Sequence, residues 1–371
     1  MTKGTPRTPS AFVKHAQDVA GYYGFKPLRD LPEGRRFSAP TFASALQVGV
    51  RASAGVPLLY YYASTNPSHT PAGSVARDVG EVGLQVVGSE ESVGEVMLMK
   101  VLWTMLGEWG ATPVRVRLNA LGDKDSRARF ERELTAYLRR KAEHLDEACR
   151  NSLSHNPLRA YTCTSQACRT IVETGPRPVN FLTEKSRVHF RTVLEHLEHL
   201  GLPYELDDLL ASDERDPRIL FALDTEVEDA TVVGTLGGRF DEFARRSTGR
   251  QIPAVGASVF FRKKGLSSSG LPSARAVRAK LYFVQLGLPA KLRALSVLED
   301  LRRAHIPVLH SFNPAHLGDQ LREATVAGVS HLIIMGQREV LDGTVIVRQI
   351  KNSSQDIVPL LQLPKFLKTL K

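Results

Sequence analysis

Residues 263–278 divide this chain into two stretches that follow different patterns. The segment reads Lys-Lys-Gly-Leu-Ser-Ser-Ser-Gly-Leu-Pro-Ser-Ala-Arg-Ala-Val-Arg and has neither a helical nor a strand period. Gly, Ser and Pro with basic charges alone are typical of a flexible linker. A chain of 371 residues is long enough for two domains, each with its own core. We therefore expect a first domain at 1–262, a basic linker at 263–279 and a second domain at 280–371.

The positive charge of the chain is concentrated in its last third. The net charge is +10, yet residues 1–261 carry 32 basic and 32 acidic side chains. The remaining 110 residues carry 17 basic and 7 acidic side chains and hold the whole excess. Lysines and arginines that neutralise phosphates release condensed counterions, so uneven charge of this kind is typical of a polyanion-binding surface. A basic surface that only maintains solubility is the alternative.

Composition argues against a membrane anchor, a disulfide framework and a metal site. No apolar run approaches the ~20 residues that a spanning helix needs. Cys149, Cys163 and Cys168 form neither a CxxC pair nor a zinc spacing, and we interpret them as small buried apolar residues. His196 and His199 could share a helix face, but further ligands are not nearby in the sequence. So few thiols suggest a reducing compartment, and we expect a cytoplasmic protein.

Apolar periodicity divides the first domain into helices and half-buried strands. Helical spacing predicts helices at 10–24, 92–108, 125–148, 184–200 and 241–247. Strands are predicted at 56–62, 82–88, 114–118, 219–223, 231–235 and 254–261. The segment 35–50 gives no strong signal.

After residue 279 short strands alternate with helices in the order βαβαββα. The expected strands are 281–286, 307–310, 331–335 and 344–350, and the expected helices are 290–304, 314–327 and 360–370. This alternation is typical of a mixed sheet flanked by helices. It supports a separate α/β module independently of the linker.

Several stretches of the chain resemble the histidyl-tRNA synthetase family. In the first domain they are Glu81-Val-Gly-Leu-Gln-Val-Val-Gly-Ser-Glu90, Val116-Arg-Leu-Asn-Ala-Leu-Gly122, Asn156-Pro-Leu-Arg159, Gly237-Gly-Arg-Phe-Asp241 and Pro253-Ala-Val-Gly256. In the second they are Leu317-Gly-Asp-Gln-Leu321, Leu332-Ile-Ile-Met-Gly336 and Gly343-Thr-Val-Ile-Val347. The resemblance implies an α/β protein: a class II synthetase-like antiparallel sheet with helices, followed by a separate α/β anticodon-binding-like domain.

At the motif positions where the family's chemistry needs charged residues, this chain has other residue types. Adenylation joins an amino-acid carboxylate to the α-phosphate of ATP, and fixed arginines stabilise the charge that gathers on the phosphorus oxygens. By the resemblance, the motif 2 arginine corresponds to Pro67 and the glutamate after it to His69. The glutamate of the neighbouring strand corresponds to Gln85. Proline donates no hydrogen bond, so the first loss removes the donor outright.

The other two motifs of the family are also altered. Its histidine loop, Arg-Gly-Leu-Asp-Tyr-Tyr, corresponds here to the stretch that starts at Ser212 and reads Ser-Asp-Glu-Arg-Asp-Pro. In motif 3, Gly256 remains, the second glycine becomes Phe260, and the closing Glu-Arg pair becomes Arg262-Lys263. We expect no catalytic residues, and we expect ATP and Mg²⁺ as cofactors only if activity is retained.

The stretch Gly237-Gly-Arg-Phe-Asp241 remains, and in the family it lines the active-site sheet. Adjacent glycines in a strand permit a close approach of a ligand or of a neighbouring element. Because the rest of the site is lost, we favour a packing role.

Three hypotheses follow from these observations. The first is a non-catalytic RNA-binding homologue whose first domain serves as a dimerisation or docking platform. The second is a regulatory subunit that resembles the synthetase-like partner of ATP phosphoribosyltransferase, although that family typically ends before an anticodon domain. The third is a diverged but active histidine–tRNA ligase. We favour the first, with tRNA or structured RNA as the partner, a homodimer as the assembly, and a protein partner as the alternative.

Basic residues of the second domain and the linker are the candidates for phosphate contacts. They are Arg322, Arg338, Arg348, Lys351, Arg275 and Arg278. The first four lie on or beside the stretches that resemble the tRNA-facing part of the anticodon domain. Base-specific reading is not expected, because the domain offers few aromatic side chains for stacking.

Overall fold

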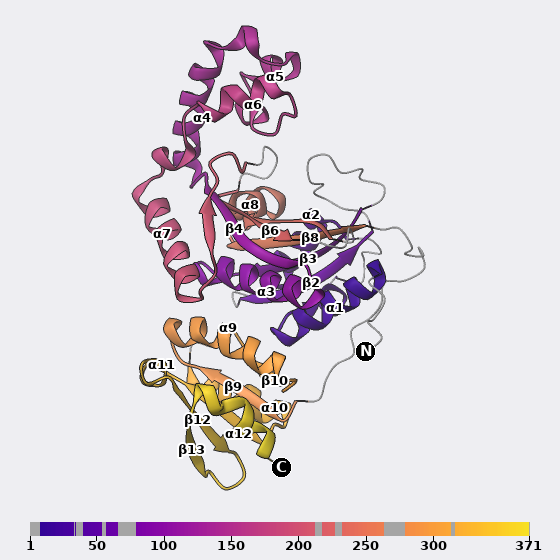
Figure 1. The fold of residues 1–371 in the computed structure, drawn as a ribbon, viewed down its shortest axis with the longest axis vertical. Helices are drawn as coiled ribbons and strands as arrows, with labels where there is room; N and C mark the ends of the chain where they lie inside the picture. Colours follow the sequence, from indigo (N-terminus) through magenta and orange to yellow (C-terminus); the bar gives the residue numbers. More distant parts are fainter. Residues whose placement is uncertain are drawn as a thin grey trace.

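The computed structural model describes residues 8–32, 34, 40–53, 57–65, 79–211, 217–226, 232–262, 279–312 and 316–370. The linker segment 263–278 lies outside the described residues, as do Pro67, His69, Ser212, Lys263, Arg275 and Arg278. The described elements form two sheets and a helical arm that projects from the larger sheet, at the end opposite the smaller one (Figure 1). No described helix is both long and apolar enough to cross a membrane.

The larger sheet has eight strands and is mainly antiparallel. Its order is β1-β2-β3-β8-β7-β6-β4-β5. The strands are β1 (Lys26–Pro27), β2 (Leu58–Ser64), β3 (Val79–Val87), β4 (Thr112–Ala120), β5 (Tyr204–Leu206), β6 (Ile219–Glu226), β7 (Val232–Arg239) and β8 (Ala254–Arg262). Of these, the short edge strands β1 and β5 run parallel to their neighbours. The antiparallel sheet expected from the sequence is therefore present.

Helices cover both faces of this sheet (Figure 1). They are α1 (Pro9–Tyr22), α2 (Phe42–Ala52), α3 (Val93–Trp109), α7 (Glu184–His199) and α8 (Asp241–Thr248). Helices α1, α3 and α7 share one core with the sheet, and α2 and α8 share another with its opposite face. Helix α2 occupies the segment that gave no strong sequence signal. It begins with a capping box, in which Thr41 and Ser44 bond each other's backbone N–H groups.

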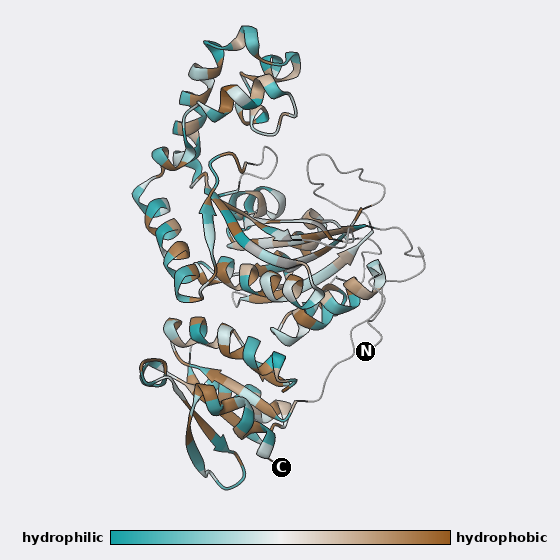
Figure 2. Cartoon of the chain, in the orientation of Figure 1, coloured by the Kyte–Doolittle hydropathy of each residue, from teal (hydrophilic) through white to brown (hydrophobic). Residues whose placement is uncertain are grey.

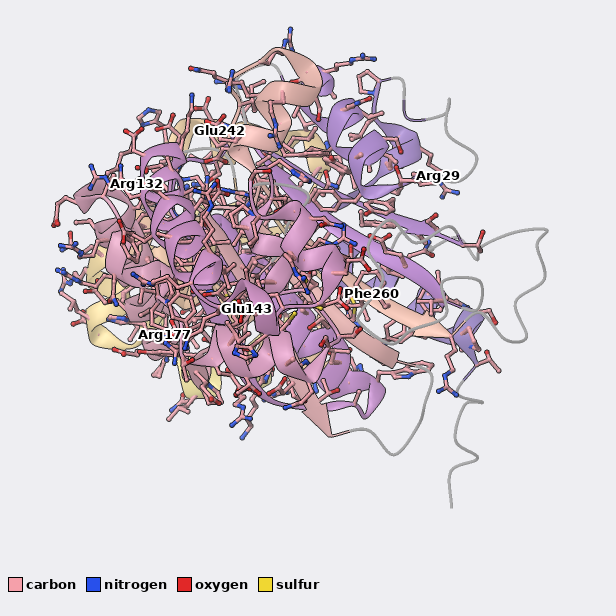
Figure 3. All side chains as sticks on the ribbon, turned by 90° about the horizontal axis from the view of Figure 1, so that it is seen from above. Arg29, Arg132, Glu143, Arg177, Glu242 and Phe260 are labelled. Carbon is pink, nitrogen blue, oxygen red and sulfur yellow. The ribbon has the colours of Figure 1, made fainter. Side chains whose placement is uncertain are left out.

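The arm is inserted between β4 and β5. It contains α4 (Lys124–Arg139), α5 (Glu147–Ser152) and α6 (Gln166–Glu173), which enclose a small core of their own. Figure 3 views the molecule from the side of the arm, on which Arg132, Glu143 and Arg177 lie. The single helix expected over 125–148 is wrong, because α4 ends at Arg139 and a turn precedes α5. The apolar spacing continued through that turn because both helices pack on the same core.

The base of the arm is held by one carboxylate. Asp123 caps α4 by accepting from the Ser126 N–H at 2.9 Å, and its other oxygen accepts from the Thr183 hydroxyl at 2.6 Å. Thr183 is the N-cap of α7, so the chain that leaves the sheet and the chain that returns meet at Asp123. Burial alone raises the pKa of Asp123, but these hydrogen bonds outweigh it and lower the pKa to about 2.

The smaller sheet has five strands in the order β10-β9-β11-β12-β13. The strands are β9 (Leu281–Gln285), β10 (Val308–His310), β11 (His331–Met335), β12 (Thr344–Gln349) and β13 (Gln355–Pro359). The helices are α9 (Leu288–Arg303), α10 (Leu317–Ala327), α11 (Gln337–Asp342) and α12 (Leu363–Thr369). The mixed α/β module is as expected, with two corrections: the short α11 and the edge strand β13 were not predicted. The end of the β12–β13 hairpin is hydrophilic (Figure 2), as is usual for an exposed turn.

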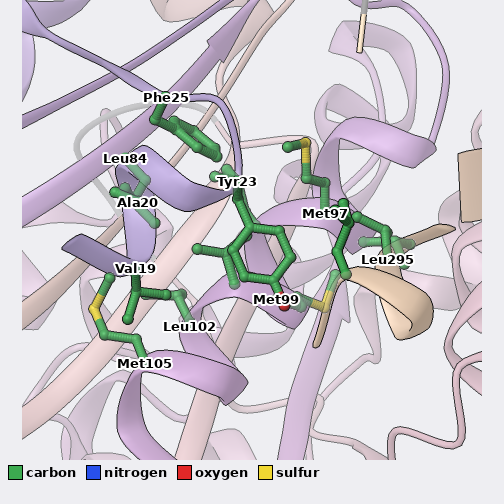
Figure 4. Close-up of a cluster of buried hydrophobic side chains, with 14 of the residues drawn as sticks. Val19, Ala20, Tyr23, Phe25, Leu84, Met97, Met99, Leu102, Met105 and Leu295 are labelled. Carbon is green, nitrogen blue, oxygen red and sulfur yellow. The ribbon is translucent and has the colours of Figure 1, made fainter. Parts of the chain in front are cut away.

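The two sheets are joined through α3 and α9. Figure 4 shows Leu295 of α9 beside Met97 and Met99 of α3. The buried apolar residues of the two parts form one continuous cluster. Helix α3 is apolar on most of its surface because the sheet covers one side and α1, α7 and α9 cover the others.

Polar contacts reinforce this junction. Lys100 of α3 and Glu299 of α9 form a buried ion pair with an N···O distance of 2.5 Å. Arg302, also on α9, binds Glu108 at 2.8 Å and Asp18 at 2.9 Å. The smaller module is therefore fixed to the larger one by packing as well as by the chain connection.

Candidate ligand-binding face and RNA-binding surface

Strand alternation decides which side chains of β3 and β8 could meet a ligand. Val82, Leu84 and Val86 of β3 point to the α1 and α3 side, where they join the main core. The intervening residues Glu81 and Gln85 therefore face α2. Because β3 pairs with β8 in antiparallel register, motif residues of both strands lie on this α2-covered face.

Gln85 is held by the protein's own groups. Its Nε2 donates to the Phe42 carbonyl at 3.2 Å, and its Oε1 contacts the hydroxyl of Tyr60. The same hydroxyl lies 2.6 Å from the Ala45 carbonyl. Both side chains are fully buried, and burial raises the pKa of Tyr60 well above its usual range. The amide at this position is thus engaged with α2 and β2 rather than presented to a ligand.

A second buried polar cluster lies further along the same strands, around Glu81. The Tyr62 hydroxyl donates to Glu81 Oε1 at 2.7 Å, and the Ser258 hydroxyl contacts the same oxygen. Burial, followed by the nearby Glu81 carboxylate, raises the pKa of Tyr62 well above its usual range. The carboxylate is fully buried and serves as a structural acceptor.

Aromatic rings of the chain occupy the space next to the strand glycines of this face. A Cβ on Gly256 would lie 2.6 Å from the Phe42 ring, and a Cβ on Gly83 would lie 2.3 Å from the Tyr62 ring. Glycines that could admit a ligand to the sheet are therefore in contact with α2 and β2. On this part of the face, the close approach is made by the protein itself.

The stretch Gly237-Gly-Arg-Phe-Asp241 is built into the core. A Cβ on Gly237 would lie 2.3 Å from the Phe221 ring. Arg239 is 1% exposed and binds Glu95 of α3 through two N–H···O bonds of 2.6 and 2.8 Å. This geometry supports the packing role favoured from the sequence.

Further partners complete the network around Arg239. Asp241 accepts from Arg239 at 3.4 Å and from Arg218 at 3.0 Å, and His189 of α7 lies 2.7 Å from Glu95. Burial by itself raises the pKa of Glu95, but Arg239 and then His189 outweigh it and lower the pKa to about 2. Burial opposes the charge of Arg239 as well, and Glu95 outweighs it, so the pKa of that guanidinium is raised. The pair stays ionised and ties α3 to β7.

Two arginines of β4, the exposed Arg115 and the half-buried Arg117, lie on the same face of the sheet, and acids pair with both. Arg117 binds Asp207 at 2.6 Å and Asp224 at 2.8 Å. Arg115 binds Asp224 at 3.0 Å and Glu205 at 2.8 Å. Because these cations are already neutralised by three carboxylates, the cluster is poorly suited to hold a triphosphate.

Arg262 ends β8 on the same face as Ser258 and is exposed. It is the first residue of the altered motif 3 pair, and the second, Lys263, lies outside the described residues. Within the described part of motif 3, Arg262 is a charged residue at an accessible place. A phosphate contact at this residue is compatible with the geometry.

The structure separates the residues expected to contact RNA. Arg348 of β12 pairs with Leu332, which packs under α10, so Arg348 and the α10 residue Arg322 belong to the same side of the smaller sheet. Arg338 lies on α11, which packs against α9 on the opposite side. Lys351 follows β12 in the exposed hairpin turn. Arg322 and Arg338 also form exposed pairs with acids on their own helices, which weakly oppose phosphate binding.

Sequence reasoning missed one grouping altogether. The structure brings the sulfurs of Cys149, Cys163 and Cys168 together in the arm. Their spacing along the chain matches no common motif, so only the packing of α5 against α6 reveals the cluster.

Known proteins resemble this chain in both sequence and fold. Residues 287–370 match the family model described as the anticodon binding domain. A histidine–tRNA ligase of Dehalococcoides mccartyi is 24% identical over 340 residues, which cover 90% of this chain and 79% of that protein. The histidine–tRNA ligase of Rhodospirillum rubrum is 29% identical over 318 residues, which cover 84% and 75%. The apo histidyl-tRNA synthetase of S. aureus superposes with a TM-score of 0.51 at 18% identity, over 100% of this chain and 98% of that structure.

The mainly antiparallel sheet followed by the matched C-terminal module defines a class II aminoacyl-tRNA synthetase architecture. Within that class, the chain is a homologue of the histidyl-tRNA synthetases and ends in their type of anticodon-binding domain.

Proposed function

We propose that this protein is a non-catalytic homologue of histidyl-tRNA synthetase that binds tRNA or another structured RNA through its C-terminal module. The observation that carries the first half is that α2 and β2 cover the part of the larger sheet around Gln85 and Gly256. Phe42 fills the space beside Gly256, and Gln85 is bonded to Tyr60 and to the backbone of α2. An adenylation site needs fixed cationic donors at the developing charge, and this part of the face presents aromatic rings instead.

The RNA-binding half of the proposal rests on the C-terminal module. Its match to the anticodon binding domain family agrees with the positive charge of the last 110 residues. Arg322 and Arg348 on one side of its sheet could contact neighbouring phosphates. A homodimer built on the larger sheet belongs to the same proposal, and no cofactor is required by it.

An active, diverged histidine–tRNA ligase is the second candidate, and the ligases of Dehalococcoides mccartyi and Rhodospirillum rubrum favour it by similarity. Arg262 is the residue through which ATP contact could persist. The matched anticodon-binding module argues against a regulatory subunit that lacks such a module.

ATP–pyrophosphate exchange with histidine tests the catalytic half directly. We expect exchange no higher than in the absence of histidine, with the Rhodospirillum rubrum ligase as the positive control under identical conditions. Histidine-dependent exchange that disappears in Arg262→Ala would overturn the non-catalytic proposal and establish the ligase. Binding of tRNA is measured separately, so the two halves of the proposal can fail independently.

A further inference from the structure

The three cysteines of the chain lie together in the arm. Cys149 is in α5, Cys168 is in α6, and Cys163 is in the segment that precedes α6. Their sulfur atoms all lie within 4.8 Å of one another. Cys149 and Cys168 are buried, whereas Cys163 is half-buried, so the cluster has one side that solvent can reach.

The sulfur arrangement is close to that of a thiolate metal site. Sulfurs bound to one tetrahedral Zn²⁺ at ~2.3 Å stand about 3.8 Å apart, so small side-chain rotations would bring these three sulfurs to that spacing. Separations of this size also allow weak thiol–thiol contacts, and further features of the site are needed to favour a cation.

Backbone amides supply the first of these features. The Ser165 N–H lies 3.5 Å from the sulfur of Cys163, and the Asp146 N–H lies 3.3 Å from the sulfur of Cys168. A neutral thiol gains little from an N–H donor, whereas a thiolate is stabilised by it. Burial raises the pKa of the Cys149 thiol, so a cation must displace the proton of this sulfur.

A polar cavity next to the cluster supplies the second feature. Its volume is about 570 Å³, and besides Cys149 and Cys163 its lining includes Asp146, Arg159, Thr162 and Ser165. Such a lining accommodates a water molecule as the fourth ligand. Three thiolates and a divalent cation leave one net negative charge, which Arg159 can offset.

We propose that Cys149, Cys163 and Cys168 bind one thiophilic metal ion of the Zn²⁺ class, with the fourth position open to the cavity. Soft thiolate ligands select such ions over Mg²⁺ or Ca²⁺. The site would join α5, α6 and the segment between them, in an arm whose own apolar core is small. This site does not depend on the proposed RNA-binding function.

Metal titration of the reduced, full-length protein tests this site. After metal removal, Co²⁺ should bind with a stoichiometry of one and give sulfur-to-cobalt charge-transfer absorption, which Zn²⁺ then displaces. In the metal-free protein the half-buried thiol of Cys163 should react with an aromatic disulfide reagent faster than the two buried thiols, and Zn²⁺ should protect it. A rate for Cys163 that saturating Zn²⁺ leaves unchanged, or no charge-transfer absorption with Co²⁺, would overturn the proposal.

Two variants distinguish this site from other metal-binding residues. Cys163→Ser removes the least buried ligand with little change in volume and should weaken Zn²⁺ binding by at least ~100-fold. His199→Ala removes half of the histidine pair on α7 and should leave the affinity unchanged. Equal affinity in Cys163→Ser and the unchanged protein would refute the three-thiolate site. A disulfide between two of these cysteines, found by mass spectrometry in protein that binds no metal, would overturn the metal site and assign the cysteines to a redox pair.

Discussion

Arg239 illustrates how a motif residue can be retained for structure. Its guanidinium is 1% exposed and bound in a bidentate pair to Glu95, which itself is fully buried. Removing one partner of such a pair leaves an uncompensated charge in the interior. The motif therefore maintains the contact between β7 and α3 whether or not the protein binds a substrate.

Arg239→Met should lower the free energy of unfolding by about 3–5 kcal/mol, because Glu95 then remains buried without its partner. Urea unfolding followed by the fluorescence of Trp103 and Trp109, both on α3, measures this loss. Arg245→Met is the matched control, since Arg245 forms an exposed pair with Glu242 on one helix and should cost under ~1 kcal/mol. Equal losses in the two variants would contradict the structural role of Arg239.

Gly256→Ala should destabilise the protein by ~1–3 kcal/mol, because the new methyl group would overlap the Phe42 ring. In a double-mutant cycle, the loss should shrink when Phe42 is already alanine, since the cavity then accepts the methyl group. Gly318→Ala is the control: nothing lies within 4 Å of its added Cβ, and alanine favours the α10 helix. Additive effects at Gly256 and Phe42 would mean that α2 does not close this face.

At the scale of elements, the contact between α1, α3, α9 and β10 decides how the two modules are held. The Tyr22 hydroxyl donates to the Ile306 carbonyl at 3.0 Å. Near it, both ring nitrogens of His310 are buried, and the ring lies beside the backbone of Tyr22. Burial of this ring lowers the pKa of His310 to about 4, from 6.5. The junction is therefore sensitive to acid.

His310 should make the protein less stable as the pH falls from 6.5 towards 4. Between these values the unfolded chain binds a proton at this ring that the folded protein does not, so the stabilisation is complete above pH 6.5 and is lost towards pH 4. The loss is up to ~3 kcal/mol. Thermal unfolding across this range should show a shallower pH dependence in His310→Leu, whereas the control His144→Leu, at an exposed position, should retain the original slope. An unchanged slope in His310→Leu would contradict the burial of the ring.

At the scale of the whole molecule, the modules share a core although the sequence separates them. The linker and the C-terminal module each carry part of the excess positive charge. The C-terminal module packs on α3. A cut in the linker would leave the α3–α9 interface intact. The covalent connection and the packing are thus independent.

Limited trypsin digestion should cleave within the basic segment 263–278, as its composition predicts. Because Lys100 and Glu299 join the modules in a buried pair, the two fragments should still co-elute in size-exclusion chromatography. In cleaved protein that carries Lys100→Met, the C-terminal fragment should dissociate at a lower denaturant concentration than in cleaved protein without the substitution. Separation of the unmodified fragments in buffer alone would show that the interface is too weak to hold them.

The full-length protein should bind tRNA with an affinity that falls steeply with salt, with a log–log slope of about −3 to −5 if four to six phosphates are contacted. Reversing the charge of Arg322 and Arg348 together should weaken binding and reduce the slope by about 2. Arg338→Glu makes the same kind of change on the opposite side of the sheet and should have little effect. An equal loss in both variants would indicate nonspecific attraction to total charge.

Elements with a long regular pattern were predicted well, and those defined by distant contacts were not. Helices α1 and α7 follow the expected spacing because each buries one face in the main core and leaves the other face to solvent. Helix α2 was missed although Phe42, Leu46 and Val50 share a buried face, because its valines and its glycine have low helix propensity. Strand β13 is mostly exposed, so it lacks the alternation by which a half-buried strand is recognised.

The sequence by itself determined that a part built of helices and half-buried strands precedes a basic α/β part, because periodicity and charge are properties of neighbouring residues. The antiparallel sheet of the first part was implied only by the family resemblance. The resemblance also implied that Gln85 and Gly256 lie on the face of the sheet that carries the family's active-site motifs. Only the tertiary structure decided that Tyr60 and Phe42 close this face, and that the three cysteines meet in the arm. These contacts join segments far apart in the chain, and which distant side chains meet depends on how the helices pack on the sheet and on one another.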